Sequence, residues 1–102
     1  MNSLIARMSM EEFCEVVGLP ASQVIEIVEH GIVEPEGAGH APENWQFGPH
    51  ALIVARRATR LRRELELGWA AIALALQLLD DVDHLRQENH MLRQRLGRFV
   101  VV

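Results

Sequence analysis

The sequence predicts an all-α protein with a small two-stranded β wing and a long C-terminal helix. Three observations support this fold class: short helical patterns separated by glycine turns near the N-terminus, an alternating apolar–polar run after a loop rich in Gly and Pro, and an apolar repeat of helical spacing in the last third. A chain of 102 residues has room for one domain, or for one small domain with a helical extension. We therefore expect a compact module over residues 1–67 and a long helix over residues 68–102.

The first two helices are predicted from the signals at their ends. Ser9-Met-Glu-Glu12 is a capping box, which satisfies the first amides of a helix, so a helix is expected over about 9–17. The turn Gly18-Leu-Pro20 ends it. A second helix follows over about 20–30, with an inward side formed by Val24, Ile27 and Val28. Gly31 suits the left-handed position beyond that helix. Two short helices joined by such a turn form a helix-turn-helix unit.

The wing and the third helix come next. Ile32-Val-Glu-Pro35 predicts one strand and Trp45-Gln-Phe47 predicts the strand that returns beside it. Gly48-Pro-His50 opens a third helix that runs to about Leu65, with an inward side formed by Leu52, Ile53, Ala55, Ala58 and Leu61. The bend Glu66-Leu-Gly68 then precedes a long helix, expected from about Trp69 to Arg98. This order predicts a winged helix-turn-helix module followed by a long helix.

Charge is distributed unevenly along the chain. Residues 1–50 contain one arginine and eight glutamates, residues 51–102 contain nine arginines and six acidic residues, and there is no lysine. A protein that reads nucleic acid normally carries basic residues on its reading element, whereas this front half is acidic. We therefore predict that the first two helices bind a basic protein surface through Glu12, Glu15, Gln23, Ile25, Glu26 and Glu29. The alternative is an ordinary solvated helix face.

The third helix carries the one feature that favours nucleic acid. This feature is a run of five arginines: Arg56, Arg57, Arg60, Arg62 and Arg63. Arg56, Arg60 and Arg63 share a face of the helix, and Arg57 is offset from them. A basic patch alone is a weak signal, and Glu64 partly neutralises it. The alternative function is a transcription regulator that reads DNA with the second helix.

A heptad repeat marks the long helix. Its positions step by alternating three and four residues, as in a coiled coil: Val82, Leu85, Asn89, Leu92, Leu96 and Phe99. Because a single Asn in such a seam fixes register and strand number, we predict a homodimer formed through this helix.

The direction of pairing stays open. Parallel helices would place Asp81 opposite Arg86, and Glu88 opposite Arg93, of the second copy, whereas antiparallel helices would tend to oppose arginines. A repeat this short leaves a third alternative, in which the helix folds back on its own core.

Catalysis, metals and cofactors have no support in the sequence. The five histidines show no metal-ligand spacing with Cys14 or with a pair of glutamates, and there is no Gly-rich phosphate loop or nucleophile motif. We expect a protein that is not an enzyme and that holds no metal or cofactor. The apolar stretch Trp69–Leu79 is too short to span a bilayer, and the first residues lack a signal-peptide pattern. With a single cysteine, this predicts a cytoplasmic protein.

The order and spacing of the elements resemble the MerR-like winged helix-turn-helix proteins. Gly18 lies at the turn, Gly31-Ile-Val33 follows the second helix, and Arg60-Leu-Arg-Arg-Glu-Leu-Glu-Leu-Gly68 leads into the last helix. Members of that family carry arginines on the second helix and a basic residue in the wing for phosphate contacts. Here the matching helix positions are Ser22 and Ile25, and the wing contains glutamates but no Arg or Lys, so this face repels a phosphate backbone.

A narrower resemblance covers nearly the whole chain. Six segments resemble the CbpM family of chaperone modulatory proteins: Glu12-Phe-Cys14, Gly31-Ile-Val-Glu-Pro35, Arg60-Leu-Arg-Arg-Glu-Leu65, Leu78-Leu-Asp-Asp-Val82, His84-Leu-Arg-Gln-Glu-Asn89 and Leu92-Arg-Gln-Arg-Leu96. The resemblance implies that the protein binds the J-domain of a CbpA-like co-chaperone and inhibits its co-chaperone and DNA-binding activities. J-domains present a basic helix to their chaperone, so an acidic protein surface can compete for it.

Overall fold

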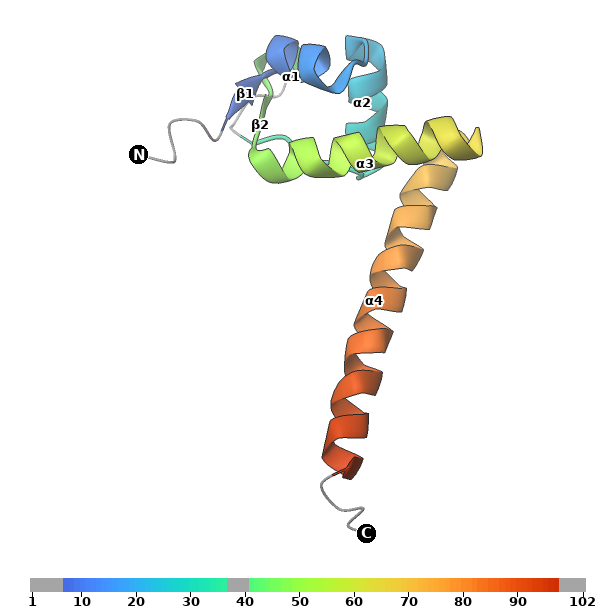
Figure 1. Ribbon diagram of the computed structural model, residues 1–102. Coiled ribbons are helices and arrows are strands. Elements are labelled where there is room, and N and C mark those ends of the chain that lie inside the picture. Colours follow the sequence, from blue (N-terminus) through green and yellow to red (C-terminus); the bar gives the residue numbers. More distant parts are fainter. Residues whose placement is uncertain (1–6, 37–40, 98–102) are drawn as a thin grey trace.

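The computed structural model describes residues 7–36 and 41–97. Its elements are, in chain order, β1 (Met8–Ser9), α1 (Met10–Val17), α2 (Ala21–Glu29), the 3-10 turn η2 (Pro42–Asn44), β2 (Gln46–Phe47), α3 (Pro49–Leu65) and α4 (Trp69–Gly97). The first three α-helices and the sheet form a head, and α4 leaves the head beside the end of α3 (Figure 1). The predicted all-α fold with a two-stranded sheet and a long C-terminal helix is confirmed.

Helix α1 begins at the predicted capping box. The Ser9 hydroxyl accepts a hydrogen bond from the Glu12 amide (3.1 Å), and the Glu12 carboxylate accepts one from the Ser9 amide (2.9 Å). Gly18 ends the helix with φ at 82°, where a side chain would be strained. The bond from the Ser9 backbone amide is also the main cause that lowers the pKa of the Glu12 carboxyl.

Replacing Ser9 with Ala should lower the free energy of unfolding by about 1 kcal/mol at neutral pH, because one amide of the first turn loses its partner. Urea denaturation measures the change, and Ser22→Ala on α2 is the matched control. Since the pKa of Glu12 is lower in the folded protein, its stabilising effect is present above the ordinary pKa of 4.5 and is lost as the pH falls through the lowered value. Ser9→Ala keeps the backbone amide that binds the Glu12 carboxylate, so both proteins should lose most of this stabilisation in acid and the difference between them should change little. Equal stabilities of the two proteins at pH 7 would contradict the prediction.

The strand predicted over residues 32–35 is wrong. The amides of Gly31 and Ile32 donate to carbonyls in the last turn of α2 (3.0 and 2.9 Å), which closes that helix in a Schellman arrangement. The Ile32 amide is therefore used by the helix, and Pro35 has no amide to give to a sheet. The segment contributes Val33 to the core instead, and that side chain is buried.

The strand that pairs with β2 is β1, at the other end of the head. The pairing is antiparallel, with Met8 opposite Phe47 and Ser9 opposite Gln46. Glu36 adds an isolated antiparallel bridge to Gln46. The predicted partner of the returning strand was therefore wrong, although the prediction of two strands was right.

The core of the head joins α1, α2, α3 and β2. Phe13 of α1 and Phe47 of β2 are fully buried and stack, with ring centroids 4.0 Å apart. Helix α3 reaches this core through a row of small side chains: Ala51, Ala55, Ala58 and Thr59. Ile53, which was expected to face inward, is 66% exposed because it lies roughly 200° around the helix from Ala51.

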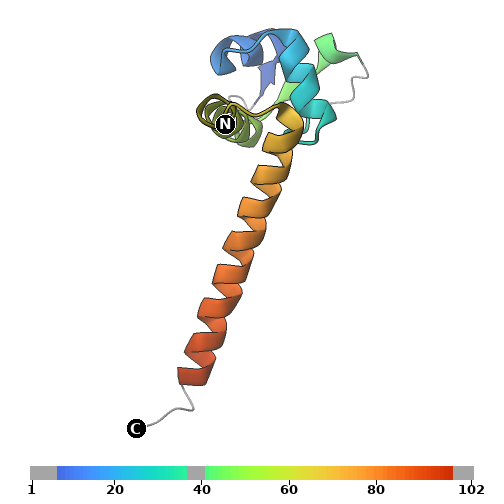
Figure 2. The same ribbon diagram turned by 90° about the vertical axis from the view of Figure 1, so that its right-hand side faces the viewer.

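Only the first turns of α4 belong to the core. Trp69 is 3% exposed and Ile72 is fully buried, whereas every residue from Gln77 to Gly97 is exposed. We call residues 77–97 the stem; both views show it extending away from the head (Figures 1 and 2). Within the described ranges, no helix is both long and apolar enough to cross a membrane.

Candidate protein-binding site

Four glutamates of the predicted binding set lie in solvent. Glu12 and Glu15 are on α1, Glu26 and Glu29 are on α2, and all four are exposed. The spacing of three residues places the two carboxylates of each pair on one face of their helix. Helix α1 packs against α2, so both pairs belong to the head. We call them the glutamate pairs.

The glutamate pairs differ in whether their carboxylates form hydrogen bonds within the chain. Glu12 accepts the hydrogen bond of the capping box. For Glu15, Glu26 and Glu29, the described part of the chain contains neither an ion pair nor a side-chain hydrogen bond. The α2 pair is therefore the more available to a basic partner.

The other two predicted binding residues are half-buried. Ile25, expected to stand outward, packs partly against the core. The side-chain oxygen of Gln23 accepts hydrogen bonds from Arg62 on α3 and Trp69 on α4. The periodicity of α2 gave no sign of these contacts. The one signal of such contacts in the sequence is that Arg62 and Trp69, which both carry hydrogen-bond donors, lie on either side of the Leu67-Gly68 bend.

The predicted seam of α4 is uncovered. Its apolar members are between 40% and 63% exposed: Val82 40%, Leu85 63%, Leu92 56% and Leu96 62%. Asn89 is exposed between them, and Phe99 lies outside the described residues. The stem does not fold back on the head, so the alternative of intramolecular packing is wrong for this part of the seam. Large exposed apolar side chains in a continuous row are typical of an interaction surface.

The arginine face of α3 is also exposed. Arg56, Arg57, Arg60 and Arg63 are all solvent-facing. Within residues 7–36 and 41–97 there is one ion pair, between Arg7 and Glu36 (3.1 Å). The four arginines of α3 therefore form no ion pair with the glutamate pairs in this part of the chain. The head thus presents separate acidic and basic regions.

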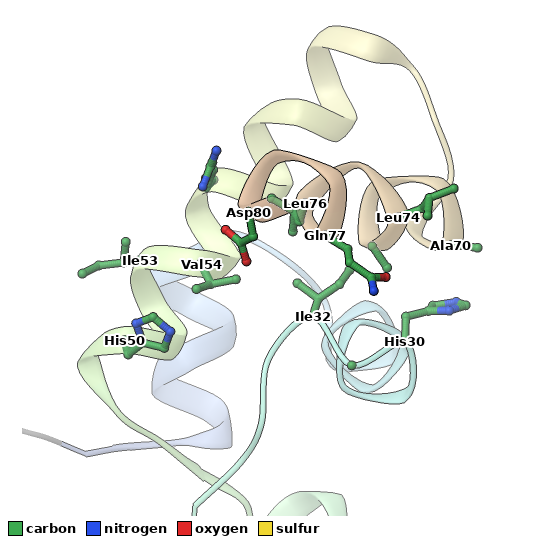
Figure 3. Close-up of a pocket in the computed structure, with 13 residues that line it drawn as sticks. His30, Ile32, His50, Ile53, Val54, Ala70, Leu74, Leu76, Gln77 and Asp80 are labelled. Carbon is green, nitrogen blue, oxygen red and sulfur yellow. The ribbon is translucent and has the colours of Figure 1, made fainter. Parts of the chain in front are cut away.

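An open groove of about 700 Å³ lies between the end of α2, α3 and the first turns of α4 (Figure 3). Ile32, Val54 and Leu76 give it apolar walls, and His50 and Asp80 also line it.

The described residues contain no group of three or more potential metal ligands. Burial raises the pKa of the Cys14 thiol.

The chain has close relatives of known class. The family model of MerR HTH family regulatory proteins matches residues 8–94. A chaperone modulatory protein CbpM from Pseudomonas putida strain F1 is 52% identical over 99 residues, which is 97% of this chain and 96% of the relative. CbpM of Pseudomonas entomophila strain L48 is 51% identical over 98 residues, 96% of this chain and 95% of the relative. CbpM of Escherichia coli O1:K1 is 47% identical over 100 residues, 98% of this chain and 97% of the relative.

These matches cover both the head and the stem. They agree with the resemblance of the six sequence segments and with the helix-turn-helix of α1 and α2. The chain belongs to the MerR helix-turn-helix family of regulatory proteins and to the CbpM chaperone modulatory proteins, which are regulators and not enzymes.

Proposed function

We propose that this protein binds the J-domain of a CbpA-like co-chaperone and thereby inhibits the co-chaperone and DNA-binding activities of that partner. The observation that carries the proposal is the exposed glutamate pair of α2, Glu26 and Glu29, on the second helix of a helix-turn-helix scaffold. A basic J-domain helix and this acidic helix are complementary in charge, which favours rapid and specific association. The inhibition is steric, because an occupied J-domain helix cannot contact its chaperone.

The stem completes the proposal. We propose that two copies pair through the seam from Val82 to Leu96, continued by Phe99, to form a cytoplasmic homodimer. The exposed apolar row and the single Asn89 within it support pairing with a second copy. We propose that the chain divides into a module over residues 1–67 and a long helix over residues 68–102. The start of that helix packs in the core of the head through Trp69 and Ile72.

A direct comparison of two ligands tests the proposed function. Purified protein should bind an isolated J-domain, with an association rate that falls as salt is raised, because screening weakens charge steering. Duplex DNA should bind at least tenfold more weakly at the same low salt, because the reading helix offers no phosphate contacts. Surface plasmon resonance with both ligands measures the two affinities. A J-domain that fails to bind at any salt concentration would contradict the proposal.

One observation favours a second function. The four exposed arginines of α3 form a basic face that could contact a phosphate backbone. If duplex DNA binds tightly with a steep salt dependence, and if Arg56→Ala and Arg60→Ala reduce that binding, a DNA-binding role replaces the chaperone proposal.

A further inference from the structure

Three side chains from three helices meet where α3 gives way to α4. The side-chain oxygen of Gln23 on α2 accepts hydrogen bonds from Arg62 Nη1 in the last turn of α3 (2.6 Å) and from Trp69 Nε1 at the start of α4 (2.7 Å). The Arg62 guanidinium lies over the Trp69 ring, 4.5 Å from its centroid. In residues 7–36 and 41–97, these are the only side-chain hydrogen bonds that join two different helices.

The cluster is largely shielded from water. Trp69 is 3% exposed, and Gln23 and Arg62 are half-buried. A hydrogen bond from a charged donor is stronger than one between neutral groups, and stacking on an indole fixes the direction of the guanidinium. One acceptor oxygen therefore ties α2 to both helices that meet at the bend.

The direction of α4 depends on this region. Beyond Leu76 its side chains are exposed, which leaves about 30 Å of helix without support at the usual rise per residue. The far end of α4 lies about 43 Å from the bend at this rise per residue, so a rotation of 10° at the bend would move it by about 7 Å. The position of the stem seam relative to the α2 glutamate pair therefore depends on the angle at the bend.

We infer that Gln23, Arg62 and Trp69 form an elbow clamp, a set of positioning residues that fixes the direction of α4 relative to α2. The clamp holds two surfaces in a fixed geometry, the α2 glutamate pair and the stem seam. The inference rests on the proposed function only for the roles of these two surfaces. Gln23 is half-buried and lies one turn before Glu26 on the same helix that carries the α2 glutamate pair. A partner docked on α2 therefore meets the stem in one orientation.

Distances between the head and the far end of the stem test the clamp. Spin labels are attached to cysteines placed at Glu11 on α1 and Gln94 on α4, in a Cys14→Ser background, and pulsed dipolar spectroscopy gives the distance distribution. Labelled protein is diluted with unlabelled protein at a total concentration at which circular dichroism shows the stem to be helical, so that distances within one folded chain are measured. No J-domain is present, so failure of this experiment leaves the docking proposal standing, and failure of docking leaves the clamp standing.

The parent should give a single narrow distribution. Gln23→Ala should broaden it or shift its maximum by several ångströms, while Gln87→Ala, an exposed glutamine on the stem, should leave it unchanged. Gln23→Glu should restore the narrow distribution, because its carboxylate accepts from both donors and its bond to Arg62 becomes charge-assisted. If Gln23→Ala does not fold, as judged by circular dichroism, Trp69→Phe removes the indole donor, keeps a ring beneath Arg62 and should broaden the distribution partially. The inference would be overturned if the folded Gln23→Ala or Trp69→Phe variant gave an unchanged distance distribution. It would also be overturned if Gln23→Ala and Gln23→Glu broadened the distribution equally.

Discussion

Reversing both charges of the α2 glutamate pair, in a Glu26→Lys and Glu29→Lys double variant, should weaken J-domain binding by roughly 30-fold, or about 2 kcal/mol. Each exposed ion pair contributes about 0.5 kcal/mol, and the reversal replaces each attraction by a repulsion of similar size, so the two positions together give about 2 kcal/mol. Both side chains are exposed, and within residues 7–36 and 41–97 neither forms an ion pair or a side-chain hydrogen bond, so the fold should survive. Isothermal titration calorimetry measures the affinity, and circular dichroism confirms the helical content.

The matched control reverses two glutamates elsewhere. Glu34→Lys with Glu43→Lys makes the same change in net charge, and both residues are exposed outside α1 and α2. This double variant should slow association through the loss of long-range steering but change the affinity only a few-fold. Equal weakening by the two double variants would mean that net charge, and not the α2 face, determines binding. Unaltered binding by the first would exclude α2 as the docking helix.

Replacing Leu92 with Glu should convert the proposed homodimer to monomer. Leu92 is 56% exposed on the single chain, and in a paired seam it would be covered by the second copy. Each chain of the variant would then bury an unpaired carboxylate and lose an apolar contact, so dimer affinity should fall by roughly a thousandfold, or about 4 kcal/mol. Sedimentation equilibrium at tens of micromolar measures the effect.

Gln94→Glu is the control for the stem. It adds the same charge two residues away, on the side of α4 that faces away from the seam, and should leave the dimer intact. If the wild type sediments as a monomer at these concentrations, the dimer proposal is wrong, and the exposed row serves another partner. That result would leave the J-domain proposal standing.

The helices could be predicted from the sequence because their signals are local. The Ser9–Glu12 capping box and Gly31 beyond α2 each satisfy backbone groups within a few residues, and both appear in the structure as expected. The exposed glutamates of α2 and the row of apolar side chains on α4 follow in the same way from helical spacing.

Pairing between distant segments could not be predicted. Strand β1 has only two residues, too few to show alternation, and its register with β2 is fixed by the fold of α1. The contact of Gln23 with Arg62 and Trp69 spans 39 and 46 residues, and a polar side chain on α2 gives no sign of whether it meets solvent or another helix. Ile53 shows the converse: an apolar residue near a helical stripe lies on the open side of α3.

Because the stem is uncovered, its helix should unfold locally more readily than the helices of the head. Its backbone hydrogen bonds are all within one helix, and no burial in the head stabilises them beyond Leu76. Most of the stability of a helix in a protein comes from tertiary packing of its apolar face, which the stem lacks in a single chain. Amide protons of the stem should therefore exchange with solvent far faster than those of α3, which is buried along one side. Helix content in the stem and association with a second copy then form one linked equilibrium, in which dilution unravels the helix as it separates the chains.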